Sequence, residues 1–341
     1  MNKDWTLNEK ELLEAFKNKE TSTKEKIEII NLVRYNNGYK DGIVKKKKTI
    51  SDINAAKNIF LNKMKKDYQY LGEDFITFII ELKKSNIFKT NIEEPAYSNS
   101  TNKIVDLTLD TYSKYSKDLY KKAKQIINNK SILFVENIYN SSYMIYLSSL
   151  KKAFCVIDKF DSPYNTIHEI QHAIEANANF LGPQLYVELG PITFETLFID
   201  ELVKNKYENA NLLYFNRIND DYEHLQDLNK YFNALLYAKK YNFNLTTYKF
   251  IFMFTQIMKV DKDSILEFIN QEITYNYLID ELIYLMSHIK SIEIRDMILN
   301  DKKQGLIELR KNLNCYYQNY KYNEKDIDSI KKYVKEINRK K

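Results

Sequence analysis

The stretch AFCVIDKFDSPYNTIHEIQHA, residues 153–173, changes from one periodicity to another along its length. Its first part is short, apolar and rich in β-formers, which is typical of a buried strand. After Asp161 the pattern is helical: Ser162 can cap a helix that has Pro163 at its first position, and Gly182 can end it. The stretch therefore predicts a strand that leads through a short loop into a helix.

Two more strand-like segments precede this stretch, so the chain is expected to hold one small sheet. They are Ser131–Glu136 and Tyr143–Leu147, and with Ala153–Ile157 they are interpreted as a small antiparallel sheet. Elsewhere apolar residues recur at helical spacing, and only six Gly and four Pro interrupt 341 residues. The sequence thus predicts a mainly α protein with a small antiparallel sheet next to the helix at Pro163.

The predicted helices lie on both sides of this sheet. Before it we expect helices over Leu7–Asn18, Lys24–Tyr35, Ile53–Met64, Phe75–Lys84 and Val105–Asn128, with a loop at Gly38/Gly42 and a basic run at Lys45–Lys48. After it we expect Pro191–Lys206, Asp221–Tyr241, Thr246–Lys259, Glu272–Ile289, Glu293–Asn312 and Asp326–Asn338. The Pro-, Ser- and Asn-rich stretch Asn91–Lys103 is interpreted as a linker. It predicts an N-terminal helical region at 1–103 and a second domain at 104–341.

Charge and cysteine usage limit the expected partners and compartment. The 52 Lys and Arg against 46 Asp and Glu give a mild net charge of +6, so nucleic acid is not expected as a partner. Cys155 and Cys315 form no CxxC pair, which favours a reducing compartment. No window of about 18 residues is apolar and uncharged, and the N-terminus does not resemble a signal peptide. We therefore expect a soluble, cytoplasmic protein without a membrane partner.

The helix after Pro163 carries a metal-binding motif, His168-Glu169-Ile170-Gln171-His172. Helix positions four apart share one face, so both imidazoles can reach one ion at about 2 Å from each nitrogen. Glu169 lies about 100° around the helix from His168, where it can reach a metal-bound water without being a ligand. This is the HExxH zinc-peptidase arrangement, and it predicts Zn²⁺ as the cofactor. The alternative is two half-buried histidines on an amphipathic helix.

A catalytic zinc site needs a third protein ligand and one open position. The continuation HExxHxxGxxH is absent, because Glu175 stands in place of its glycine and Ala178 in place of its third histidine. The remaining candidates are Glu188 and Glu195 in the segment VELGPITFE, residues 187–195. They are two helical turns apart, so both could face the metal helix, and periodicity does not choose between them.

The stretch 153–173 resembles the strand, loop and metal helix of the thimet oligopeptidase/oligoendopeptidase F family of zinc metallopeptidases. Residues 187–195 are similar to the second motif of that family, and the match implies that Glu188 is the third ligand. It also implies that Glu195 is an acid that orients a ligating histidine. The segment Ile273–Ile283 resembles the family's Tyr-rich helix, whose tyrosine hydrogen-bonds the substrate carbonyl and the oxyanion. Tyr277 aligns best there, and Tyr275 second.

The resemblance covers about Val105–Ser291 and implies a function and an architecture. It implies a zinc-dependent endopeptidase that hydrolyses short or extended peptides by a metal-activated water, with Glu169 as the general base. It implies two helical lobes around a cleft, and a zinc-peptidase catalytic domain at 104–341. The substrate expected is a peptide. Since the chain is shorter than full-length members of the family, a partner subunit could complete the cleft.

Three departures from the family pattern leave an alternative open. Gln171 replaces a glycine inside the metal motif, and Ile265 and Asn270 replace a histidine and the first tyrosine of the Tyr-rich helix. These changes would suit a catalytically degenerate peptide-binding protein of the same fold. The intact metal motif and Glu188 favour the enzyme. A second alternative, a helical interaction or nucleic-acid module, would rest on the basic N-terminal region, including Lys45–Lys48.

Overall fold

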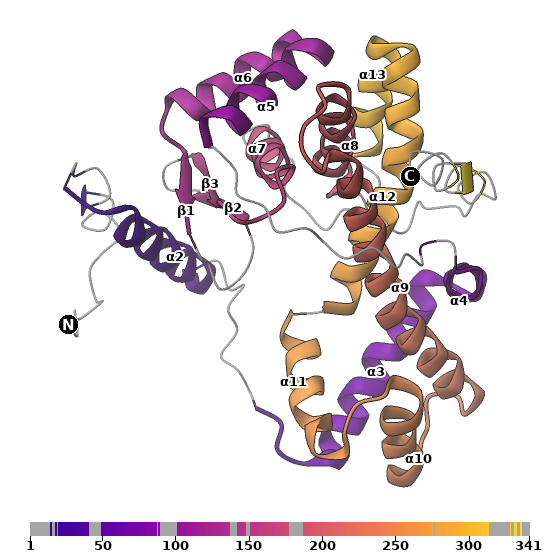
Figure 1. The fold of residues 1–341 in the computed structure, drawn as a ribbon. Coiled ribbons are helices and arrows are strands. Elements are labelled where there is room, and N and C mark those ends of the chain that lie inside the picture. The colour runs from indigo at the N-terminus through magenta and orange to yellow at the C-terminus, as the bar shows by residue number, and fades with distance from the viewer. Residues whose placement is uncertain are drawn as a thin grey trace. The chain divides into compact units, whose positions relative to one another are not determined.

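The computed structural model of the chain is mostly helical and holds one small sheet (Figure 1). It describes residues 20–40, 49–86, 101–136, 142–147, 151–176, 187–275 and 277–313, together with isolated residues outside these ranges. The chain forms two compact units. The first comprises Met1–Lys46, Pro95–Gly182 and Gly190–Ala210, and the second comprises Lys47–Glu94, Pro183–Leu189 and Asn211–Lys341.

The sheet belongs to the first unit and contains β1 (Ile132–Val135), β2 (Tyr143–Leu147) and β3 (Lys152–Asp158). Its order is β1-β3-β2, with β2 antiparallel and β1 parallel to the central strand β3. The sheet is therefore mixed, and the prediction of an antiparallel sheet is wrong for the β1–β3 pair. More than a dozen residues separate these two strands, which is enough chain for a parallel crossover, and short apolar runs do not encode strand direction.

Five helices of the described chain accompany the sheet: α2 (Thr23–Lys40), α5 (Thr101–Tyr115), α6 (Lys117–Asn128), α7 (Asn165–Ala176) and α8 (Leu189–Lys204). Helices α2 and α7 pack against the sheet. Phe154 of β3 lies in an apolar cluster with Ile29 and Ile30 of α2, whereas the thiol of Cys155 donates to the Glu169 carbonyl of α7. Since neighbouring residues of a strand face opposite ways, the two helices cover opposite faces of the sheet.

Helix boundaries in the first unit differ from prediction where polar residues decide them. The helix predicted over Val105–Asn128 is two helices, because Ser116 adopts an extended backbone and its hydroxyl accepts from the Leu119 N–H as the N-cap of α6. Helix α2 runs to Lys40, through the loop predicted at Gly38. Helix α5 begins at Thr101, so the last residues of the predicted linker are helical, and residues 91–100 lie outside the described chain.

The second unit contains seven described α-helices around an aromatic core. They are α3 (Ile53–Leu71), α4 (Glu73–Lys84), α9 (Ala210–Lys240), α10 (Thr247–Phe252), α11 (Ile265–Tyr275) and α12 (Tyr277–Asn300), followed by α13 (Lys302–Asn312). A π-helix (Met253–Met258) and a 3₁₀ turn (Lys262–Ser264) connect α10 to α11. The ring of Phe60 lies 5.1 Å from that of Phe254 and 6.5 Å from that of Tyr231, centroid to centroid. Such tilted and edge contacts are favourable aromatic geometry.

Several predicted boundaries in the second unit are wrong. The helix predicted to begin at Glu272 begins at Ile265 as α11, and the helix predicted over Glu293–Asn312 is interrupted at Asp301. Helix α9 begins at Ala210, not Asp221, and α12 continues to Asn300 through the break predicted after Ile289. No Gly or Pro interrupts this part of α12, and the next helix begins only where the Asp301 carboxylate caps α13.

Some predictions fall outside the described residues. They are most of the helices over Leu7–Asn18 and Asp326–Asn338, the basic run Lys45–Lys48, the helix stop at Gly182, and Cys315. The division of the chain between residues 103 and 104 stays a prediction. Within the described part of the chain, every helix is too short or too polar to cross a bilayer.

Candidate metal centre

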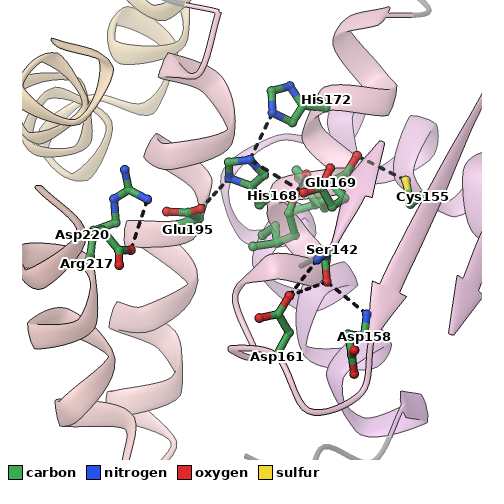
Figure 2. Close-up of polar contacts among 12 residues, drawn as sticks. Ser142, Cys155, Asp158, Asp161, His168, Glu169, His172, Glu195, Arg217 and Asp220 are labelled. Carbon is green, nitrogen blue, oxygen red and sulfur yellow. Dashed lines mark hydrogen bonds and ion pairs between the residues drawn. The ribbon is translucent and has the colours of Figure 1, made fainter. Parts of the chain in front are cut away.

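A short loop sets the start of α7, the helix that carries the HExxH motif (Figure 2). The Asp161 carboxylate accepts from the backbone N–H and the hydroxyl of Ser142, both at 2.8 Å, and the Ser142 hydroxyl accepts from the Asp158 N–H at 3.1 Å. The chain turns at Ser162, whose carbonyl accepts from the Asn165 N–H. Helix α7 therefore begins at Asn165, two residues later than predicted for Pro163.

His168, Glu169 and His172 lie together on α7. The Nε2 atoms of the two histidines are 3.1 Å apart, and Glu169 Oε1 is 3.9 Å from His168 Nε2. Within the described chain, these three residues form the group whose ligand atoms lie within 4.8 Å of one another. Two nitrogens that share a tetrahedral zinc at about 2 Å lie roughly 3.3 Å apart. The separation of the two nitrogens is therefore close to that of two zinc ligands.

Glu195 of α8 contacts the other nitrogen of His168. Glu195 Oε1 lies 2.5 Å from His168 Nδ1, and the carboxylate is almost completely buried. A carboxylate accepts only, so this contact places the proton of a neutral imidazole on Nδ1 and leaves the lone pair on Nε2, the atom that faces His172. Metal-bound histidines are commonly held this way. The role of Glu195 toward a bound metal stays a prediction.

Glu188 is buried directly before the first residue of α8. It is not part of the close group formed by the three α7 side chains among the described residues. Its role as the third ligand stays a prediction.

Gln171, which stands where the resembled family has a glycine, is buried in a hydrogen-bonded chain. The Tyr112 hydroxyl of α5 lies 3.1 Å from Gln171 Oε1, and Gln171 Nε2 donates to Glu175 Oε1 at 2.8 Å. Burial, together with the Glu175 charge, raises the pKa of Tyr112 well above its usual value, so Tyr112 is a neutral donor. The side chain of Gln171 is thus enclosed between α5 and α7.

Glu175 also packs against the first turn of α8. A Cβ built on Gly190 would lie 1.8 Å from Glu175 Oε1, so the carboxylate occupies the space that any larger side chain would need. Sequence reasoning missed Tyr112, Glu175 and Gly190 as parts of the site. Only the four-residue spacing of Gln171 and Glu175 pointed to their contact.

We expect Gly190→Ala to displace Glu175 and with it the contact between α7 and α8. Overpacking should cost about 1–3 kcal/mol of unfolding free energy, and zinc affinity should fall by about 10-fold because the supports of the metal ligands shift. Zinc titration and thermal unfolding measure both.

Gly305→Ala is the matched control, since its Cβ would meet the Ile298 backbone at 2.5 Å in the second unit. It should lose stability and keep its zinc affinity. Unchanged zinc affinity in Gly190→Ala would contradict the role of this contact.

Cys155 does not offer a thiolate to the site. Its thiol donates to the Glu169 carbonyl at 3.2 Å and is fully buried. Burial, with the nearby charge of Glu169, raises the pKa of this thiol well above its usual value. A protonated thiol is neither a nucleophile nor a metal ligand, so Cys155 serves to anchor α7 on β3.

The candidate tyrosines flank the junction of α11 and α12. Tyr275 is the last residue of α11 and Tyr277 the first of α12, and their side chains lie outside the described part of the structure. Ile265 and Asn270, which differ from the resembled family, both contribute to the fold. Ile265 is fully buried, and the Asn270 amide both accepts from the Ile50 N–H and donates to the Ile50 carbonyl, each at 3.0 Å.

Neither a protein-family model nor a curated protein sequence matches this chain. Among solved structures, a "putative peptidase" from Chlamydophila abortus is 15% identical, with a TM-score of 0.48 over 83% of this chain and 55% of that one. A "putative oligoendopeptidase F" from Bacillus anthracis str. Ames is 12% identical, with a TM-score of 0.45 over 92% of this chain and 61% of that one. PZ peptidase A, solved with an inhibitor, is 12% identical, with a TM-score of 0.45 over 96% and 66%. The chain thus spans 55% to 66% of the length of these structures.

Proposed function

We propose that the protein is a zinc-dependent endopeptidase that hydrolyses short or extended peptides by a metal-activated water. The observation that carries the proposal is the pair of His168 and His172 Nε2 atoms 3.1 Å apart on a mostly buried helix, with Glu169 beside them. Two histidines four apart on a helix with an adjacent glutamate are the donor set of a zinc peptidase. Peptide is the expected substrate. We also propose a reducing compartment such as the cytoplasm, because Cys155 is buried as a free thiol.

His168 and His172 would hold the zinc, and Glu188 is proposed as the third ligand. A zinc ion bound there would lower the pKa of a bound water and polarise the scissile carbonyl. Glu195 keeps His168 in the tautomer and orientation that the metal requires, through the contact at Nδ1.

Glu169 is proposed as the general base and, later, the general acid. Its carboxylate lies beside the ligand atom of His168 and is shielded from solvent. It would take the proton of the attacking water and deliver it to the leaving amine. Tyr277, with Tyr275 as the second choice, would donate a hydrogen bond to the carbonyl oxygen as negative charge develops on it.

The ranking of the two downstream acids is a separate prediction. Glu188→Gln should release zinc or weaken its binding severely, because it replaces a charged ligand by an amide. Glu195→Gln should keep the metal but lower zinc affinity or the rate of peptide cleavage by about 10–100-fold, as is usual when a residue that hydrogen-bonds to a metal ligand is changed. Equilibrium zinc titration of both variants ranks them. The opposite order would show that Glu195, not Glu188, is the ligand.

A peptide-binding protein without activity is the second candidate, favoured by the Asn270 amide. Where the resembled family has a tyrosine, this side chain is engaged with the backbone of Ile50. N-acetylated and C-amidated peptides separate the two candidates, since only an endopeptidase cleaves blocked ends internally. We expect internal products by mass spectrometry, and none after chelator treatment. Tight peptide binding with no products would favour the binding protein.

A further inference from the structure

A partly buried ionic network, with Glu272 as its buried member, lies beneath the junction of α11 and α12 in the second unit. Lys63 of α3 places its Nζ 2.9 Å from Asp67 Oδ2 and 3.4 Å from Glu272 Oε2 of α11. The Tyr231 hydroxyl donates to Asp67 Oδ2 at 2.5 Å. Helices α3 and α11 pack against each other, which brings these charges together (Figure 1). The mechanism proposed above does not use any of them.

Glu272 also reaches across the junction. Its Oε1 accepts from the Leu278 N–H at 3.1 Å. Leu278 is the second residue of α12, so its N–H is among the four that a helix leaves without an internal partner. A carboxylate at a helix N-terminus is also favoured by the helix dipole. Glu272 therefore ties α11 to the first turn of α12, and its bond to Leu278 spans the positions of Tyr275 and Tyr277.

The two carboxylate oxygens of Glu272 face two different positively polarised groups. Oε1 faces an N–H and Oε2 faces an ammonium group. The side chain is only 2% exposed, and this burial raises the pKa of Glu272 while Lys63 and the Leu278 N–H oppose the rise. A buried ion pair is not by itself a gain over apolar packing. Here the ion pair with Lys63 instead helps to hold the Glu272 carboxylate in one orientation.

We infer that Glu272, oriented by Lys63, is a positioning residue for the tyrosines at the junction. It would hold the start of α12, and with it the backbone that carries Tyr277 and Tyr275, the tyrosines proposed to act on the substrate carbonyl. The inference rests on the proposed peptidase function and names a residue outside the metal motif on which turnover depends.

Glutamine at position 272 is the informative change. An amide has one accepting oxygen and one NH₂ donor, so the NH₂ must face either the Leu278 N–H or the Lys63 ammonium. Glu272→Gln should therefore shift the junction and lower kcat by at least about 10-fold, since a misplacement of about 1 Å can cost 10²-fold. KM and zinc content should change little. The double variant Lys63→Met/Glu272→Gln removes the opposing donor and should recover most of kcat. Glu267→Gln, an exposed acid on the same helix, is the control and should match wild type.

Tyr277→Phe shows whether the effect passes through the tyrosine. It should cost about 10²–10³-fold in kcat in the wild-type background and clearly less in the Glu272→Gln background, because residues that act together are non-additive. If Glu272→Gln does not fold in a thermal melt, Glu272→Asp replaces it. Its shorter carboxylate cannot reach both donors, so the same loss of kcat is expected.

The outcomes separate this inference from the proposed function. If wild type cleaves peptides with zinc and Glu272→Gln is equally fast, only the positioning role is wrong. The same holds if Lys63→Met fails to restore Glu272→Gln, or if Tyr277→Phe costs as much in both backgrounds. If wild type itself cleaves no peptide, the proposed function fails, and this inference fails with it.

Discussion

Replacing Glu169 by glutamine should leave zinc bound and slow peptide turnover by about 10²–10⁴-fold, the usual contribution of a positioned general base. Gln is nearly isosteric with Glu but cannot take a proton from the attacking water. Zinc should stay, because the proposed ligands His168, His172 and Glu188 would hold it without this carboxylate. The fold should also survive, since the Cys155 thiol contacts the backbone carbonyl of Glu169 and not its side chain.

The measurement for Glu169→Gln is kcat together with zinc content and peptide affinity on one preparation. Glu136→Gln is the control, because it removes an acid from the first unit that forms only a surface ion pair with Lys159. It should behave as wild type. If Glu169→Gln kept full turnover, Glu169 would not be the base.

Removing either motif histidine should release most of the zinc, since the site loses one of its two imidazole ligands. The two variants should differ in the stability of the metal-free protein. His168→Ala also takes the imidazole from the buried Glu195 carboxylate, which should cost about 1–3 kcal/mol of unfolding free energy. His172 is half-buried, so His172→Ala should cost less.

Zinc titration and denaturant unfolding of the metal-free forms test both parts of this prediction. Equal destabilisation by the two variants would show that the Glu195 contact does not stabilise the fold. Full zinc occupancy in the double variant His168→Ala/His172→Ala would contradict the metal site.

The sequence predicts best what is local. The strand Ala153–Ile157, the loop after it and the metal helix follow from neighbouring residues, and the four-residue spacing brings the two motif histidines together. The structure extends this strand by one residue at each end and begins the helix at Asn165, because the Ser162 carbonyl accepts from its N–H.

What the sequence did not predict depends on contacts between distant segments. The direction of β1 depends on its pairing with β3, which short apolar runs do not encode. The contact between Glu175 and Gly190 depends on where α8 packs, and the bond from Leu278 to Glu272 depends on how α11 meets α12. A charged residue in a helical pattern is usually exposed, so nothing in the sequence marked Glu272 as buried.

The most direct test of the zinc-peptidase account is to titrate zinc into metal-free wild-type protein while following the cleavage of a quenched-fluorescent peptide library. The account predicts a rate that rises from zero and saturates at one zinc per chain. Zinc binding at one per chain with no cleavage of any peptide, or cleavage that does not depend on zinc, would contradict it.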